Sequence, residues 1–305
     1  MRALLIGGSG FIGSHVVDQL LERGHEVRVF DRVPERLRPT PAGVDLRLGQ
    51  LGDGAALADA LVDVDCVFHM ASTTVPSTSN LDPVADIEDN LINTVRLLQL
   101  MQEAEVDHIL FLSSGGTVYG IPQTPMVRED HLLRPISSYG VVKVAIENYL
   151  LAAQHLHGLK PLILRPSNPY GPRQGLTGVQ GVIGTFLRCV AQNKPLEIWG
   201  DGQIVRDFFY VSDLARLIVD CLESDITGVY NVGSGTGNSI REIVDVVAHV
   251  TGQQLKPAYK SGRGFDVPRI VLDANAIKQD FGWSPQVTLD EGVSRTWEWV
   301  RSNLS

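Results

Sequence analysis

The chain has 305 residues and a net charge of -9, with 44% hydrophobic and 20% charged residues. This composition is ordinary for a globular enzyme, and the length allows one large domain or two smaller ones. Because the chain is acidic and has no Lys/Arg cluster, nucleic acid and anionic membrane surfaces are not expected as partners. The three cysteines are scattered without metal-ligand spacing, and no apolar stretch is long enough for a membrane span or a signal peptide. We therefore expect a cytoplasmic protein that contains no structural metal.

The first thirteen residues contain the strongest local signal. The apolar run Ala3–Ile6 predicts a buried strand, and a helical pattern follows over Ser14–Arg23. Between them, Gly7–Gly13 has the spacing G-x-x-G-x-x-G, which allows a tight turn and a close approach of the backbone to a pyrophosphate at the helix N-terminus.

A second predicted strand strengthens this interpretation. Glu26–Phe30 is followed by Asp31, at about the 20-residue offset expected of a carboxylate that binds a ribose. A glycine-rich turn alone is weak support, but the strand, turn, helix, strand and acid together predict a dinucleotide site.

Strands and helices alternate through the rest of the first half. Strands are predicted at Leu46–Leu48, Cys66–His69, Ile109–Leu112 and Pro161–Leu164. Helices are predicted at Gly54–Leu61, Val84–Glu103 and Ser138–His157. Strands separated by helices of this length indicate a parallel sheet covered on both faces, so the fold class is α/β with a Rossmann-type doubly wound sheet.

The composition changes after Arg165, where prolines and glycines mark a long irregular crossing. Elements of both kinds follow it, without a repeat: helices from Val182, Ser212 and Ser239 (capped by Ser239 with Glu242), and strands at Leu196–Trp199, Asp207–Val211 and Gly228–Val232. We expect residues 1–165 to form the dinucleotide-binding domain, joined by elements from about 207–232. Residues 166–305 are then mainly a smaller α/β lobe that binds the substrate.

Tyr139 and Lys143 form Y-x-x-x-K near the start of a predicted helix, which puts both side chains on one face. A phenol ionises near pH 10, but an adjacent ammonium and an oxidised nicotinamide favour the phenolate, a base that works near neutral pH. The same spacing also occurs in surface Tyr–Lys pairs. Here the Y-x-x-x-K motif follows a predicted dinucleotide-binding turn and a Ser-Ser-Gly-Gly-Thr turn at a strand end. In this context the motif predicts the reaction centre.

These motifs together resemble a known family. The segments Gly7–Gly13, Ser113–Gly120, Tyr139 with Lys143, and Arg165–Gly171 look like those of the extended short-chain dehydrogenase/reductase family. Within it the chain most resembles nucleotide-sugar 4-epimerases of the UDP-glucose 4-epimerase type, from Met1 to the Gly282-Trp283 segment.

The resemblance implies a tightly held NAD. The positions that match the family's cofactor ligands are Gly7, Gly10, Phe11, Ile12, Gly13, Asp31, Arg32, Gln50, Leu51, Met70, Ala71, Ser72, Asn90, Ser113, Tyr139 and Lys143. A carboxylate at Asp31 favours NAD over NADP because it repels a 2′-phosphate, although Arg32 and Arg36 leave NADP open. Gln50 stands where the family usually has Asp, and its amide can still bond to adenine.

On the substrate side, the resemblance implies a nucleotide sugar, most simply a UDP-sugar. The matching positions are Asn168, Glu197, Trp199, Arg206, Arg263 and Asp266. Two guanidiniums suit a diphosphate, and Trp199 matches an aromatic that packs on uracil. Ile270 matches a position that tunes pocket size, but the sugar stays open, and so does thymine as the base.

One position departs from the family. The hydroxyl donor of the Ser-Ser-Ser turn is replaced here by Gly115, with Ser114 and Thr117 flanking it. If the chain stays extended, residues 115 and 117 face the same side, so Thr117 is the expected replacement. A turn at Gly115-Gly116 removes this reason and leaves Ser114 open.

The reaction implied is 4-epimerisation through a transient 4-keto sugar, with Tyr139 as the base. The Asp-Glu pair of sugar dehydratases is absent, which argues against dehydration. The alternatives are an NADPH-dependent 4-ketoreductase and a dinucleotide-sensing regulator. The family commonly forms homodimers through helices that match Val84–Glu103 and Val141–His157.

Overall fold

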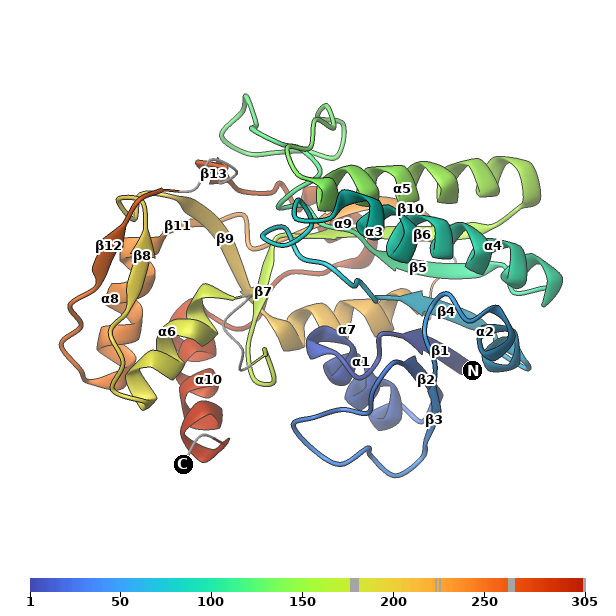
Figure 1. Ribbon diagram of the computed structural model, residues 1–305, viewed down its shortest axis with the longest axis horizontal. Coiled ribbons are helices and arrows are strands. Elements are labelled where there is room, and N and C mark those ends of the chain that lie inside the picture. Colours follow the sequence, from blue (N-terminus) through green and yellow to red (C-terminus); the bar gives the residue numbers. More distant parts are fainter. Residues whose placement is uncertain (176–180, 223, 225, 263–266, 304–305) are drawn as a thin grey trace. The chain divides into compact units, whose positions relative to one another are not determined.

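The computed structural model describes residues 1–175, 181–222, 224, 226–262 and 267–303 (Figure 1). By their mutual contacts these residues form two units, and each is described by itself. The first unit comprises residues 1–118, 135–165 and 215–230, and the second comprises residues 119–134, 166–214 and 231–305.

The first unit is built on a seven-stranded sheet, as counted over the described residues. Its strands, in spatial order, are β3 (Val44–Leu48), β2 (Glu26–Asp31), β1 (Arg2–Ile6), β4 (Cys66–His69), β5 (His108–Leu112), β6 (Lys160–Pro166) and β10 (Gly228–Val232). The neighbours from β3 to β6 pair in parallel. The strand order reverses beside β1, as in a Rossmann-type doubly wound sheet, and the predicted fold class is confirmed.

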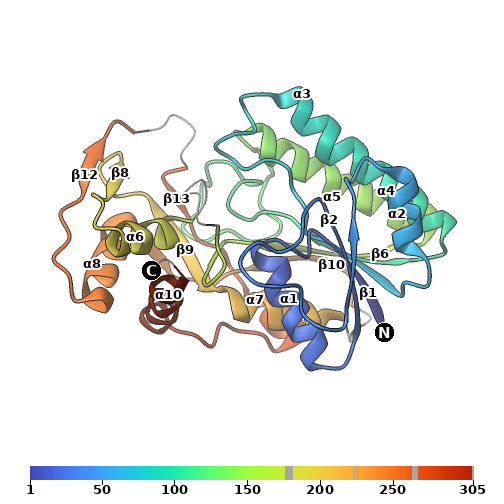
Figure 2. The same ribbon diagram turned by 60° about the horizontal axis from the view of Figure 1, so that its bottom comes forward.

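Helices cover both faces of this sheet. The helices on these faces include α1 (Phe11–Glu22), α2 (Gly54–Leu61), α4 (Asn93–Glu103), α5 (Ser138–His157) and most of α7 (Val211–Leu222). Helices α1 and α7 lie on one face, and α2, α4 and α5 lie on the other (Figures 1 and 2). Strands β1 and β4 are buried on both sides, which explains their continuous apolar sequences.

The predicted helix Val84–Glu103 is not a single α-helix. It consists of α3 (Pro83–Asp86), the π-helix η1 (Ile87–Ile92) and then α4. The side-chain amide of Asn90 donates to the backbone oxygen of Asp86 at 3.1 Å, taking the carbonyl that an α-helix would give to the Asn90 N–H. A side chain inserted into the helix ladder in this way widens the turn.

The second unit has its own sheets and core. Its strands are β7 (Asn168–Tyr170), β8 (Glu197–Trp199), β9 (Val205–Tyr210), β11 (Gly237–Ser239), β12 (Ala258–Lys260) and β13 (Arg269–Ile270). Strand β9 pairs with β7, β11 and β13, while β8 pairs with β12. The helices are α6 (Val182–Ala191), α8 (Ile240–Thr251), α9 (Asn275–Phe281) and α10 (Leu289–Asn303). Apolar side chains of α6, α8 and α10 form one buried cluster.

Among the helices in the described part of the chain, none is both long and apolar enough to cross a membrane.

Candidate active site

The turn between β1 and α1 requires glycine at specific positions. Gly7 has a φ of +88°, and a Cβ there would lie 2.7 Å from the backbone nitrogen of Ala71. A Cβ on Gly13 would lie 2.4 Å from the oxygen of Gly7. The turn therefore packs backbone against backbone, where the segment after β4 meets the segment after β1.

Helix α1 offers its N-terminus at this turn. Its cap residue is Gly10, so the cap makes no side-chain hydrogen bond, and the first turn contains no acidic residue. The N–H groups of the first turn and the positive end of the helix dipole thus suit an anion. The residues present fit the pyrophosphate of a dinucleotide.

Asp31, the last residue of β2, lies beside the same turn. Its carboxylate accepts the backbone N–H of Ser9 at 3.0 Å and that of Arg32 at 2.7 Å. These bonds hold a carboxylate next to the pyrophosphate position, where it can accept ribose hydroxyls. The side chains of Arg32 and Arg36 are exposed.

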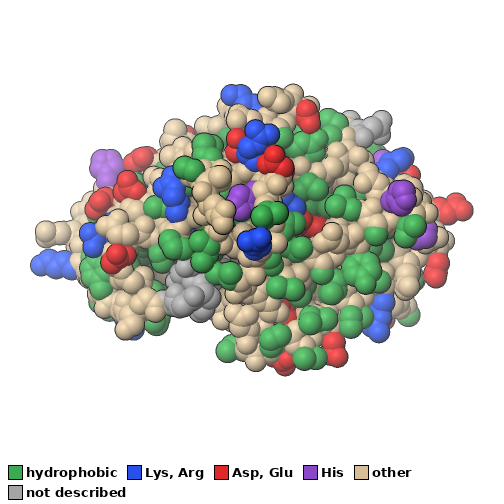
Figure 3. Space-filling view, turned by 90° about the horizontal axis from the view of Figure 1, so that it is seen from above, with side chains coloured by type: hydrophobic (Ala, Val, Ile, Leu, Met, Phe, Trp, Pro, Cys, Tyr) green, Lys and Arg blue, Asp and Glu red, His purple; other side chains and the backbone are tan. Residues whose placement is uncertain are grey.

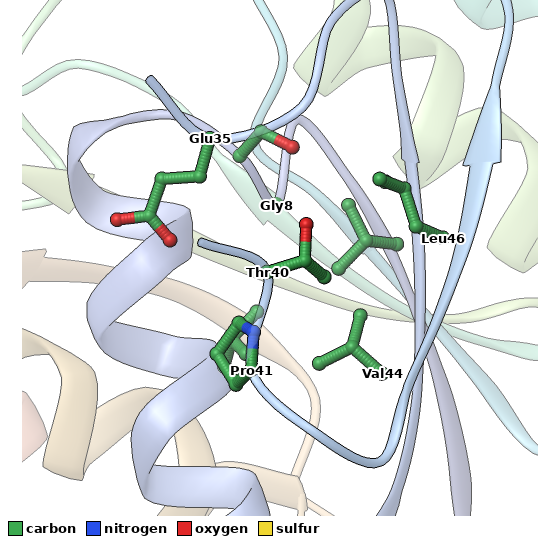
Figure 4. A pocket seen from close by; sticks show the side chains of 9 residues that line it. Gly8, Glu35, Thr40, Pro41, Val44 and Leu46 are labelled. Carbon is green, nitrogen blue, oxygen red and sulfur yellow. The ribbon is translucent and has the colours of Figure 1, made fainter. Parts of the chain in front are cut away.

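A small hollow adjoins Gly8 and Ser9 of this turn (Figure 4). Thr40 and Pro41 of the loop before β3, with Val44 and Leu46 of β3, point into it. Among the described residues, its lining includes Glu35 and neither Lys nor Arg.

The other positions expected at the cofactor differ in what they bond to. Leu51 and Ala71 pack against the apolar core, and Gln50 is exposed. The Ser72 hydroxyl donates to the oxygen of Thr74 at 3.0 Å. Asn90 is buried, and its amide bonds to Thr73 and Asp86, so its side chain fastens the segment after β4 to α3.

Tyr139 and Lys143 lie in the first two turns of α5, on one face. The Lys143 ammonium is buried and donates to the oxygen of Leu112 at 2.9 Å. It also lies 5.6 Å from the centre of the Tyr139 ring and 4.6 Å from that of Phe111. The structure thus brings the predicted pair together at the end of β5.

Burial changes the acidity of both groups. Burial first, and the Asp86 carboxylate second, raise the pKa of Tyr139 from 10.0 to about 12, while a hydrogen bond with Ser114 acts in the opposite direction. Burial lowers the pKa of Lys143 from 10.5 to about 8, against the carboxylates of Glu147 and Asp86, which raise it. At neutral pH the protein alone therefore holds a phenol beside an ammonium.

The segment after β5 does not stay extended. Residues 115–119 form a turn, and the backbone N–H groups of Thr117 and Val118 both donate to the oxygen of Ser114. The Thr117 hydroxyl lies 3.5 Å from that same oxygen. The condition on which the preference for Thr117 rested is therefore not met, while a hydrogen bond with Ser114 acts to lower the pKa of Tyr139.

Two buried carboxylates near this pair were not found from the sequence. Glu147 forms an ion pair with Arg165, with 2.6 Å between Nη2 and Oε2, and it accepts the hydroxyl of Ser113. The sequence did contain a signal for Glu147: it follows Lys143 by four residues, so both side chains lie on the same face of the helix. The second carboxylate, Asp86, lies four residues before Asn90.

The residues expected at the nucleotide sugar lie in the second unit. Asn168 donates to the oxygen of Asp207 at 3.2 Å, and Arg206 donates to the oxygens of Val205 and Val267. Ile270 is buried and is the register partner of Arg206 across β13 and β9, so these two positions adjoin.

At the end of β8, Trp199 is 40% exposed and has the Lys260 ammonium 5.6 Å from its ring centre. The Glu197 carboxylate bonds to this same ammonium at 2.7 Å. Its side chain therefore neutralises a neighbouring lysine. Arg263 and Asp266 lie outside the described residues.

Comparison with known proteins gives a consistent result. The model of the NAD dependent epimerase/dehydratase family matches residues 3–233. A putative UDP-glucose 4-epimerase of Methanocaldococcus jannaschii is 35% identical over 98% of both chains.

Solved structures resemble the whole chain as well. The UDP-glucose 4-epimerase of Thermotoga maritima, solved with UDP-glucose, has a TM-score of 0.96 at 33% identity and 100% coverage of both chains. The UDP-glucose 4-epimerase of Thermus thermophilus, solved with NAD, has a TM-score of 0.93 at 36% identity and 99% coverage of both chains.

Proposed function

The chain belongs to the NAD dependent epimerase/dehydratase family, and from this premise we propose that it interconverts UDP-glucose and UDP-galactose. It is an NAD-dependent nucleotide-sugar 4-epimerase that acts through a 4-keto sugar. The observation that carries this function is the Tyr139–Lys143 pair on α5, in the same unit as a glycine turn that fits a dinucleotide. UDP-glucose is the substrate we favour because the T. maritima relative binds it.

The chemistry divides between the protein and its cofactor. Bound NAD supplies a hydride acceptor and donor and, when oxidised, a positive charge near the phenol. Tyr139 takes the proton of the sugar 4-hydroxyl and later returns it, with Ser114 as the hydroxyl that orients this transfer. The Lys143 ammonium, 5.6 Å from the tyrosine ring centre, favours the phenolate.

The two units have separate tasks in this proposal. The first unit holds NAD, with the pyrophosphate on the N-terminus of α1 and the adenosine ribose on Asp31. The second unit holds the nucleotide diphosphate and its base, through Asn168, Trp199 and Arg206. The Nη1 group of Arg206 donates to two backbone oxygens, which orients the guanidinium fork before it meets a phosphate.

We also propose a homodimer and a cytoplasmic location. Apolar residues are exposed on the helices that the family uses for dimerisation, among them Val84 of α3 and Val141 of α5. Apolar side chains are spread over the face that contains these helices (Figure 3). Sedimentation of the purified protein tests the dimer, and cell fractionation tests the location.

The substrate is tested by incubating the purified protein, without added cofactor, with UDP-glucose, UDP-N-acetylglucosamine, UDP-glucuronate and dTDP-glucose. We expect NMR to show the 4-epimer of UDP-glucose at equilibrium. Turnover only with added NADPH and a 4-keto sugar would instead identify a reductase.

A tyrosine variant tests the assigned base. We expect Tyr139→Phe to slow epimerisation by at least about 10²-fold, the contribution of a positioned proton-transfer group, while bound NAD stays in the purified protein. Tyr149→Phe is the matched control, because Tyr149 lies on the same helix and is 49% exposed. Similar rates in the two variants would contradict the role of Tyr139.

A further inference from the structure

Asp86 is a fully buried carboxylate that the reaction described above does not use. Its Oδ1 accepts the hydroxyl of Thr74 at 2.5 Å and the amide of Asn90 at 3.0 Å, and its Oδ2 accepts the hydroxyl of Ser138 at 2.7 Å. All three of these donors are neutral. A buried charge is costly unless other groups compensate it, so its retention here calls for a physical reason.

The buried charges around α5 supply that reason. Glu147 and Arg165 are buried and paired, so their charges compensate each other. His69, at the end of β4, is neutral because burial lowers its pKa to about 3. Lys143 bonds to the uncharged oxygen of Leu112. Among these described groups, Asp86 and Lys143 remain as opposite buried charges, and the Asp86 carboxylate, second to that of Glu147, raises the pKa of Lys143.

Asp86 also fixes the start of the helix that carries the base. Its partner Ser138 directly precedes Tyr139. The backbone N–H of Ser138 bonds to Asn80 at 2.9 Å, and that of Tyr139 bonds to Ser79 at 3.1 Å. The segment after β4, α3 and the first turn of α5 are thus joined at the residue next to the phenol.

We propose that Asp86 is a positioning residue of the epimerase reaction, which holds Tyr139 through Ser138 and supplies the buried negative charge opposite Lys143. This inference rests on the proposed function and deepens it. In this proposal Asp86 touches neither the sugar nor the cofactor. It acts through Tyr139 and Lys143, which do.

Removing the charge has a predictable direction. The Asp86 carboxylate raises the pKa of Tyr139 by repelling a phenolate, and it raises the pKa of Lys143 by attracting an ammonium. Both pKa values therefore fall when the charge is lost.

A variant that removes only the Asp86 charge, such as Asp86→Asn, leaves the other titratable residues around this position in place. They are Glu147 on α5, His69 at the end of β4, Glu88 and Asp89 on η1, and Asp82 at the start of α3; the groups on η1 and Asp82 are exposed. Loss of the Asp86 charge is then the one change that acts on the pKa values of Tyr139 and Lys143. We therefore expect both the acid limb and the alkaline limb of the pH profile of turnover to move to lower pH.

The experiment compares kcat against pH for the NAD-bound wild type and Asp86→Asn, with UDP-glucose as substrate. We expect a kcat at least about 10-fold lower and both limbs displaced to lower pH by about half a unit or more. Asp82→Asn is the matched control, because Asp82 caps the same helix in solvent, and its profile should equal that of the wild type. Lower kcat with unmoved limbs would overturn the electrostatic role.

Ser138→Ala separates position from charge. It removes one hydrogen bond but leaves the carboxylate, so kcat should fall several-fold without displacement of the limbs. Unchanged kcat would overturn the positioning role, even if the Asn variant fails to fold. Wild-type protein that epimerises no UDP-sugar would overturn the proposed function instead, which keeps the two failures distinct.

Discussion

At the residue scale, the reaction pair is defined by what surrounds it. Tyr139 is a phenol with a raised pKa, and Lys143 is an ammonium with a lowered one, both chiefly because they are buried. Burial alone opposes the phenolate. In the proposed reaction, the base therefore depends on groups that favour the charged form: Ser114, Lys143 and the bound cofactor.

The hydroxyl that assists Tyr139 can be identified by two variants. Because Ser114 bonds to Tyr139 and Thr117 lies in a turn near a backbone oxygen, we expect Ser114→Ala to slow epimerisation by about 10²-fold and Thr117→Val to have a smaller effect. Steady-state kcat with UDP-glucose is the measurement. The opposite order would restore Thr117 as the assisting group, and a normal rate in the double variant would assign the relay to water or the substrate.

At the element scale, the ends of the helices show how local sequence fixes local structure. Helix α8 begins with a capping box, in which Ser239 accepts the N–H of Glu242 and Glu242 accepts the N–H of Ser239, as the sequence predicted. Helix α5 begins differently. Ser137 caps it locally, but Ser79 and Asn80 come from a distant segment.

The capping box has a pH-dependent effect on stability. Hydrogen bonds from Ser239 lower the pKa of Glu242 below its usual 4.5, so the carboxylate stabilises the folded state above that pH, and the contribution is lost as the pH falls through the folded value. We expect Glu242→Gln to destabilise α8 by about 0.5–1 kcal/mol at pH 7 and by less at pH 3.5.

Thermal unfolding at the two pH values checks this expectation. Asp245→Asn is the control, because it removes an exposed carboxylate from the same helix beyond the first turn. An equal loss of Tm at both pH values would contradict the assigned role of the Glu242 charge.

At the scale of the whole molecule, the chain folds into two units with separate cores. The first is clustered around Leu4, Val67 and Ile163, and the second around Phe186, Ile243 and Val300. Since we assign NAD to one unit and the nucleotide diphosphate to the other, damage to one site should leave binding at the other site intact.

Two substitutions test this separation. We expect Gly13→Ala to lose NAD during purification, because its Cβ would lie 2.4 Å from the oxygen of Gly7, while UDP still binds. Arg206→Ala should keep NAD and raise the KM for UDP-glucose by about 10- to 100-fold, the effect of a lost charged hydrogen bond.

Matched controls exist in both units. Gly54→Ala places a Cβ in open space on α2, and Arg301→Ala removes an exposed arginine from α10. Isothermal titration with UDP and the absorbance of bound cofactor are the two readouts. Loss of both ligands in either test variant would contradict the separation of tasks.

Much of the fold could be predicted because its signals are local. The apolar strands, the glycine turn and helix α5 follow from neighbouring residues, and α5 was predicted with its observed bounds, Ser138–His157. Helix α10 was not predicted, because its buried stripe includes Gly292 and Thr296 beside Val293 and Val300, and small or polar residues weaken the apolar periodicity.

The sequence by itself determined the Rossmann-type fold, the glycine turn and the Tyr139–Lys143 pair, since each depends on spacings of a few residues. Only the tertiary structure decided that residues 115–119 form a turn, which removes the reason for preferring Thr117 and leaves Ser114 open. It alone also brought Asp86 to Ser138 and Glu147 to Arg165. These groups come from separate strands and helices, so their charges act on one another only after the sheet and its covering helices have assembled.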